Sequence, residues 1–130
     1  MKQYTTNYFD TFIEVPEDCP VLIGEIPPER KTPSVARKQF DLLKQHPYHY
    51  DSDEIIYQST AAHKELSREE FFAKPQACMR AASLVKHYGW GIHANSEGKI
   101  AMYSLDSKMY HQLKDDSKLT HIKSMRRKKG

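Results

Sequence analysis

The stretch Tyr88-Gly-Trp-Gly-Ile-His-Ala-Asn-Ser-Glu-Gly-Lys-Ile-Ala-Met-Tyr103 decides the fold class, because both of its halves are typical of β-strands. Asn95 to Gly98 form the expected loop, since Asn and Gly are the residues that tight hairpin loops need. Gly98 is expected in the left-handed backbone conformation that only Gly adopts without strain. The stretch therefore predicts a β-hairpin with strands near 89–94 and 99–105.

Side chains alternate between the two faces of such a hairpin. In the expected register Trp90 lies opposite Tyr103, and Ile92 lies opposite Ala101. His93 shares the other face with Gly91, which has no side chain and is expected to leave room there for a ligand. The only Trp of the chain is then expected on the core face.

Two further strands are expected outside the hairpin. Residues 8–15 alternate apolar and polar side chains, which predicts a half-buried strand with Asp10 and Glu14 on its exposed face. Residues 54–60 contain two β-branched Ile and a Tyr, which favours a strand. Between them, residues 16–32 carry four of the seven Pro and predict a long loop, and long loops are often functional.

Three helical regions are expected, near 33–45, 67–88 and 106–116. Thr32 followed by Pro33 is typical of a helix start. Ser67-Arg-Glu-Glu70 is a capping box. After the interruption at Pro75, apolar residues recur at helical spacing over 76–88.

These elements predict an α+β fold, with a small mixed or antiparallel sheet covered by helices. At 130 residues the chain has the length of one domain. The net charge of +3 is uneven, because six Lys and Arg and no acid lie from Lys118 to the end, so residues 1–117 carry a net charge of −3. We therefore expect a single globular domain over 1–117 and a basic, largely disordered tail over 118–130.

The apolar segments and the two cysteines predict the cellular compartment of the protein. No segment has the apolar length of a secretory signal or a membrane span, so no membrane association is expected. Cys19 and Cys78 are far apart and form no Cys-x-x-Cys motif, which indicates free thiols and a cytoplasmic protein.

The candidate ligand site is a composite of cationic and aromatic side chains. In the expected helix 76–88 a polar stripe leads into the aromatic residues of the hairpin, and two tyrosines from the 46–51 turn can close over it. Cations beside aromatic rings suit a small anionic or planar ligand. The candidate residues are Arg80, Lys86, His87, Tyr88, Trp90, His93, Tyr48 and Tyr50.

The sequence gives weaker support for a metal site, a Cys–His nucleophile or a cofactor site. His46, His49, Asp51, Asp53 and Glu54 lie close together in sequence, but their spacing matches no closed zinc site, so no metal is expected. Nine helical positions place Cys78 and His87 on opposite faces, which argues against a Cys–His nucleophile. There is no Walker loop and no dinucleotide fingerprint, so no cofactor is expected, and no catalytic residue is assigned.

Three motifs in order carry a resemblance to a known family: Thr5-Thr-Asn-Tyr-Phe-Asp-Thr-Phe-Ile-Glu-Val15, Ser67-Arg-Glu-Glu-Phe-Phe72 and Tyr88-Gly-Trp-Gly-Ile-His93. With these the chain resembles small bacterial proteins of a domain-of-unknown-function family, DUF6157. The likeness extends over roughly residues 4–125. It implies a stand-alone, single-domain protein, and it brings no activity and no site residue with it.

Three functions follow as hypotheses. The first is a non-enzymatic binding or interaction domain for a small ligand or a protein partner. The second is a small enzyme that uses His93 or His87 as acid or base, with a Tyr to orient it. The third is weak nucleic-acid binding through the basic tail, where clustered cations attach to phosphates.

Overall fold

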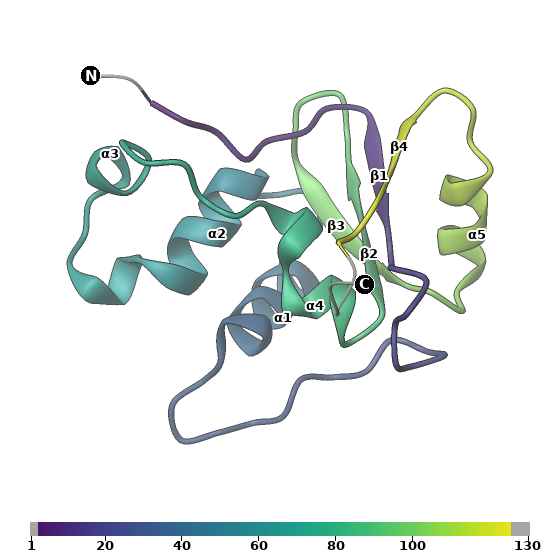
Figure 1. Ribbon diagram of the computed structural model, residues 1–130, viewed down its shortest axis with the longest axis horizontal. Helices are drawn as coiled ribbons and strands as arrows, with labels where there is room; N and C mark the ends of the chain where they lie inside the picture. Colours follow the sequence, from purple (N-terminus) through teal and green to yellow (C-terminus); the bar gives the residue numbers. More distant parts are fainter. Residues whose placement is uncertain (1–2, 126–130) are drawn as a thin grey trace.

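The computed structural model describes residues 3–125, and its centre is a four-stranded sheet in the order β3-β2-β1-β4 (Figure 1). β1 pairs antiparallel with β2 and parallel with β4, and β2 pairs antiparallel with β3, so the sheet is mixed. The α+β class is confirmed. The strands are β1 (Thr11–Glu14), β2 (Trp90–Ala94), β3 (Ile100–Ser104) and β4 (Thr120–Lys123).

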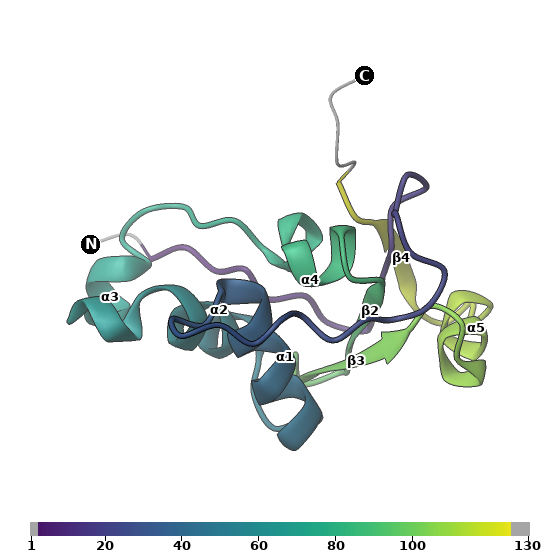
Figure 2. The ribbon, with the colours of Figure 1, turned by 90° about the horizontal axis from the view of Figure 1, so that it is seen from below.

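Helices cover both faces of this sheet (Figure 2). The larger core lies between the sheet and the first four α-helices, and a smaller core joins Phe12 to Tyr110 and Leu113 under the last one. No helix of residues 3–125 has the length and apolarity needed to cross a membrane. The helices are α1 (Val35–Gln45), α2 (Ser52–Thr60), α3 (Arg68–Phe71), α4 (Ser83–Lys86) and α5 (Lys108–Lys114), with 3₁₀ turns η1 (Ala62–Lys64) and η2 (Met79–Ala81).

The predicted hairpin is present, but its register differs by one residue from the prediction. Trp90 pairs with Ser104 and Ile92 with Met102. The reason is the loop, in which the Asn95 N–H donates to the Lys99 carbonyl (3.0 Å). The loop thus has three residues, 96–98, and ends at Gly98 with φ +81°, the geometry of a turn followed by a left-handed Gly.

Of two predicted helix starts, one is confirmed and one lies two residues later in the structure. Ser67 caps α3 in a complete capping box, as predicted. α1 begins at Val35, and its cap is Ser34, whose side chain accepts a hydrogen bond from the Arg37 N–H (3.1 Å), rather than Thr32.

The predicted strand over 54–60 is wrong, because these residues belong to helix α2. The Asp51 side chain caps the helix by accepting from the Glu54 N–H (2.8 Å), and Asp53 and Glu54 place negative charge in its first turn. Ile55 and Ile56 are both buried against α1 and the core. Helix capping and burial therefore outweigh the strand preference of two β-branched residues.

The predicted helix over 76–88 is also wrong. The chain forms only η2 and α4, separated by Ala82 in an extended conformation (φ −70°, ψ 136°). In a continuous helix the Arg80 carbonyl would accept from the amide of residue 84. It accepts instead from the Ser124 hydroxyl (2.7 Å) and the Met125 N–H (3.0 Å), so a contact from the distant end of the chain replaces the helical bond.

The predicted disordered tail over 118–130 is wrong for its first part, because residues 120–123 form β4 beside β1. The Thr120 N–H donates to the Asp10 carbonyl (2.9 Å), and the Ser124 N–H donates to the Glu14 carbonyl (2.8 Å). These two bonds extend the pairing of β4 with β1. With partners on both sides and cores on both faces, all four residues of β1 are buried, including Glu14, so β1 is not the half-buried strand that was predicted. Residues 126–130 lie outside the described residues.

Candidate functional site

Trp90 stands on the face of β2 that packs against α1. Its ring meets Phe40 edge-on, with centroids 5.5 Å apart. Its indole N–H donates to the Glu25 carbonyl (2.8 Å), which fixes the rotation of the ring. The contact with Phe40 and the satisfied N–H make Trp90 a rigid aromatic wall.

A cavity of about 490 Å³ opens beside this wall, and we call it the Trp90 cavity. Its surroundings are mostly apolar, and Lys44 carries the one charge among the residues that line it. The Lys44 ammonium lies 5.6 Å from the centre of the Phe40 ring. The lining residues are Gly24, Ile26, Phe40, Leu43, Lys44, Pro47, Trp90 and Met102.

The long loop 16–32 supplies the outer wall of the Trp90 cavity. The Glu25 N–H donates to the Tyr88 carbonyl (2.8 Å), which attaches the loop to the start of β2. A Cβ atom on Gly24 would lie 2.8 Å from the Trp90 ring, so only Gly allows this approach. Ile26 follows with 58% of its surface exposed, and it extends the apolar surface toward solvent.

The opposite face of β2 carries a second group of polar aromatic residues, which we call the Tyr48–His93–Tyr103 cluster. The Tyr48 hydroxyl lies 2.7 Å from His93 Nδ1 and 2.8 Å from the Tyr103 hydroxyl. Burial lowers the pKa of His93 from 6.5, although Asp10 and Asp116 act in the other direction. Burial and the bond to Tyr103 raise the pKa of Tyr48 above its ordinary value.

The space expected above Gly91 on this face is filled. A Cβ atom there would lie 2.5 Å from the Tyr110 ring and 2.9 Å from Phe12. Gly91 is therefore required by the close packing of α5 on the sheet, and it does not open a ligand site. His93 lies farther along the strand, where it is partly exposed.

Among the eight candidate residues, the structure brings Tyr48 and His93 into contact and distributes the others over several parts of the molecule. Trp90 and His93 lie on opposite faces, as the alternation predicts. Arg80 donates through Nε to the Lys123 carbonyl (2.8 Å), beside β4. Tyr50 packs edge-on against His46 and His49, with centroids 5.6 and 4.6 Å away. His87 and Tyr88 line a different cavity, and Lys86 ends α4, so the continuous polar stripe is absent.

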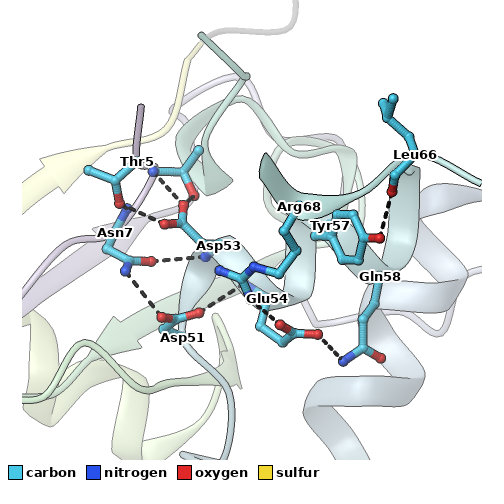
Figure 3. Close-up of polar contacts among 10 residues, drawn as sticks. Thr5, Asn7, Asp51, Asp53, Glu54, Tyr57, Gln58, Leu66 and Arg68 are labelled. Atoms are coloured by element: carbon cyan, nitrogen blue, oxygen red, sulfur yellow. Dashed lines mark hydrogen bonds and ion pairs between the residues drawn. The ribbon is translucent and has the colours of Figure 1, made fainter. Parts of the chain in front are cut away.

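Two of the three carboxylates considered for a metal, Asp51 and Asp53, bind the N-terminal segment instead, while Glu54 pairs with Arg68 (Figure 3). Asp53 accepts from the Thr5 hydroxyl (2.8 Å), the Thr6 N–H (2.6 Å) and the Thr6 hydroxyl (2.7 Å). Asp51 accepts from the Asn7 side chain (3.2 Å) as well as capping α2. Among the side chains that the structure describes, no group of three or more His, Cys, Asp or Glu is arranged to hold a metal ion.

Several residues of these sites were missed in the sequence. Lys44 follows Phe40 at a spacing of four in α1, which places both on one side of the helix. Gln39 lines the same cavity as His87 and Tyr88, and its buried position on the apolar stripe of α1 was the available signal. Tyr103 joins His93 only through Tyr48, which no local pattern indicates.

A family model described as "Family of unknown function (DUF6157)" matches residues 2–130. No curated protein and no solved structure matches the chain. The functional argument therefore depends on the geometry of this molecule.

Proposed function

Because the chain belongs to DUF6157, a family of unknown function, we propose from its geometry that it is a cytoplasmic, non-enzymatic binding domain. Its ligand is a small planar molecule with one anionic group, and the binding site is the Trp90 cavity. The observation that carries this proposal is an aromatic-walled cavity of about 490 Å³ with a single cation in its lining.

The dimensions and lining support a small molecule. Ligand sites in proteins are mostly apolar, enclose roughly 300–1,000 Å³ and use few polar groups to fix orientation. Here Trp90 and Phe40 offer flat surfaces for stacking, while Met102 and Leu43 add apolar contact. Lys44 supplies the orienting charge, and no Asp or Glu is among the lining residues to oppose an anion.

The walls of the Trp90 cavity are also held in place before a ligand binds. The bond from the Trp90 indole to Glu25 holds the ring, and the bond from Glu25 to Tyr88 holds the loop. A ligand then loses little affinity to ordering the protein.

The test uses 2-naphthoate as a planar anionic probe and the fluorescence of Trp90, the only Trp in the chain. We expect saturable quenching. Lys44→Gln should weaken binding about tenfold, which corresponds to about 1.4 kcal/mol. The matched control is Lys108→Gln, which removes a charge on α5, across the sheet. Equal binding by the two variants, or unchanged Trp emission at millimolar probe, would refute the proposal.

A second candidate function is acid–base catalysis at His93, favoured by the 2.7 Å contact between Tyr48 and His93 Nδ1. A hydrogen bond at Nδ1 orients the imidazole, and a lowered pKa keeps it neutral as a base near pH 7. An NMR titration of His93 in Tyr48→Phe tests the coupling. A His93 pKa identical to that of the wild type would show that Tyr48 does not tune it.

The nucleic-acid alternative depends on the cations of residues 118–130. Of these, Lys123 forms an ion pair with Glu17 (2.7 Å) within the fold. Arg126 to Lys129 lie outside the described residues. We keep this function as a prediction from the sequence alone.

A further inference from the structure

Gln39 is a buried amide with one unpaired acceptor. The residue lies on α1 with 3% of its surface exposed, and its Nε2 donates to the Ser59 hydroxyl (3.2 Å). Ser59 in turn donates to the Ile56 carbonyl (3.2 Å), so its oxygen must accept from Gln39, and this fixes the orientation of the amide. Gln39 Oε1 has no hydrogen-bond partner among the described residues.

An unpaired acceptor at such a site is unusual, because most buried polar side-chain atoms in proteins have a partner. Replacing Gln by an apolar residue would remove the cost of its desolvation without leaving Ser59 unpaired. The arrangement of neighbouring groups therefore gives no structural reason for an amide here. An amide is useful at this position if Oε1 accepts a hydrogen bond from a bound molecule.

Gln39 also lines two adjoining cavities, which together we call the Gln39 groove. They measure about 230 and 220 Å³ and share Val35, Gln39, Ala82 and Ser83. One end adds His87 and Tyr88, and the other adds Cys78. No Lys, Arg, Asp or Glu is among the residues that line either cavity, which distinguishes the groove from the Trp90 cavity.

We propose that the Gln39 groove is a second ligand site, for a small neutral molecule of about one ring that donates an N–H to Gln39 Oε1. The uncharged lining disfavours an ion, because a charge there would lose its hydration without gaining a partner. The small side chains of Ala82 and Val35 leave flat apolar walls for a ring. An amide or a nucleobase carries the required donor.

The groove must open slightly for this contact, because Oε1 itself is closed off from solvent. We expect this opening at Ala82, whose extended backbone joins η2 to α4. α1 separates the groove from the Trp90 cavity, since Val35 and Gln39 line the groove while Phe40 and Lys44 line the cavity. The two sites therefore have separate tests.

The experiment is an NMR titration of the full chain with benzamide, a neutral ring with an N–H donor. We expect saturable shifts of the Gln39 side-chain amide and of the Ala82 and Ser83 backbone amides. Two matched probes lack the N–H donor: methyl benzoate, which is neutral, and benzoate, which is charged. Both should bind at least tenfold more weakly than benzamide, as measured from the same signals.

Two variants complete the test. Gln39→Leu removes the acceptor and should weaken benzamide binding at least tenfold while the protein stays folded. Ala82→Leu fills the groove from its other wall and should abolish the shifts. Lys44→Gln, which weakens the Trp90 cavity, should leave benzamide binding unchanged.

The proposal is overturned if 10 mM benzamide leaves the Gln39 and Ala82 signals unmoved, because the groove then does not take a neutral N–H donor. It is also overturned if methyl benzoate binds as well as benzamide, or if Gln39→Leu binds as well as the wild type. None of these results depends on 2-naphthoate, so failure of one site leaves the other intact.

Discussion

Asp53 on α2 and Gln39 on α1 are both buried polar side chains on neighbouring helices, but they differ in their partners. Asp53 accepts three hydrogen bonds from the N-terminal segment, which closes over it (Figure 3). Gln39 uses its donor and leaves its acceptor unpaired beside a groove. The comparison teaches that burial alone does not identify a binding site. A polar group that the chain itself satisfies is part of the fold, whereas one that it leaves unsatisfied beside a cavity is a candidate for a ligand.

The largest effect is expected from Asp53→Ala. The substitution leaves the Thr6 amide and two hydroxyls without their acceptor and releases the N-terminal segment from α2. We expect a loss of about 2–4 kcal/mol of unfolding free energy, measured by urea denaturation. Asp53→Asn keeps an acceptor and should lose less. A loss below about 1 kcal/mol for the Ala variant would remove the basis of the comparison.

A smaller loss is expected from Thr6→Val, which keeps the shape of the side chain and the backbone bond to Asp53. Only the hydroxyl contacts to Asp53 and Ser52 disappear, so the cost should be about 1–2 kcal/mol. Thr5→Val is the matched control, since Thr5 is less buried and gives one bond to Asp53. Equal losses for the two variants would mean that burial does not set the strength of these bonds.

Gln39→Leu should leave stability almost unchanged, within about 0.5 kcal/mol of the wild type or slightly higher. The reason is that the lost bond to Ser59 is offset by removal of an unsatisfied acceptor, while Ser59 still donates to Ile56. Urea denaturation without ligand measures it. A loss above about 2 kcal/mol would show that Oε1 has a stabilising partner in the unliganded protein, and would make Gln39 resemble Asp53.

An effect that depends on pH is expected from His93, which is only partly buried and lies between Asp53 and Gln39 in this comparison. Its pKa is lowered in the folded state, so protonation favours the unfolded chain. Stability is then fully present above pH 6.5 and falls as the pH drops from 6.5 through the folded-state pKa. Urea midpoints at pH 7.5 and 5.0 should differ less in His93→Gln than in the wild type. Parallel pH dependence in both proteins would contradict the assigned shift.

The elements that the sequence predicted well are those with local physical causes. The turn at Gly98 and the capping box at Ser67 each depend on residues within a few positions. The helix expected near 33–45 likewise corresponds to α1. The same local rules gave a register one residue off, because a three-residue and a four-residue loop use the same turn residues.

The failures occur where distant segments compete with local preference. Residues 54–60 became a helix through the Asp51 cap and burial against α1, and the 76–88 helix broke where residues 124–125 took the Arg80 carbonyl. β4 formed within a basic stretch because β1 offered an open edge. Each of these outcomes depends on a contact between residues that are far apart in the chain.

The sequence by itself determined the α+β class, the hairpin and the separation of Trp90 from His93, because side-chain alternation and turn chemistry are properties of a few consecutive residues. Tertiary structure alone decided which groups meet. It set Lys44 and the Gly24 loop around Trp90 and joined Tyr48 to His93 and Tyr103. It also gave Asp53 its donors and left the Gln39 acceptor Oε1 without a partner. The physical reason is that hydrogen-bond partners and cavities arise from the packing of several elements at once, and no single segment carries that information.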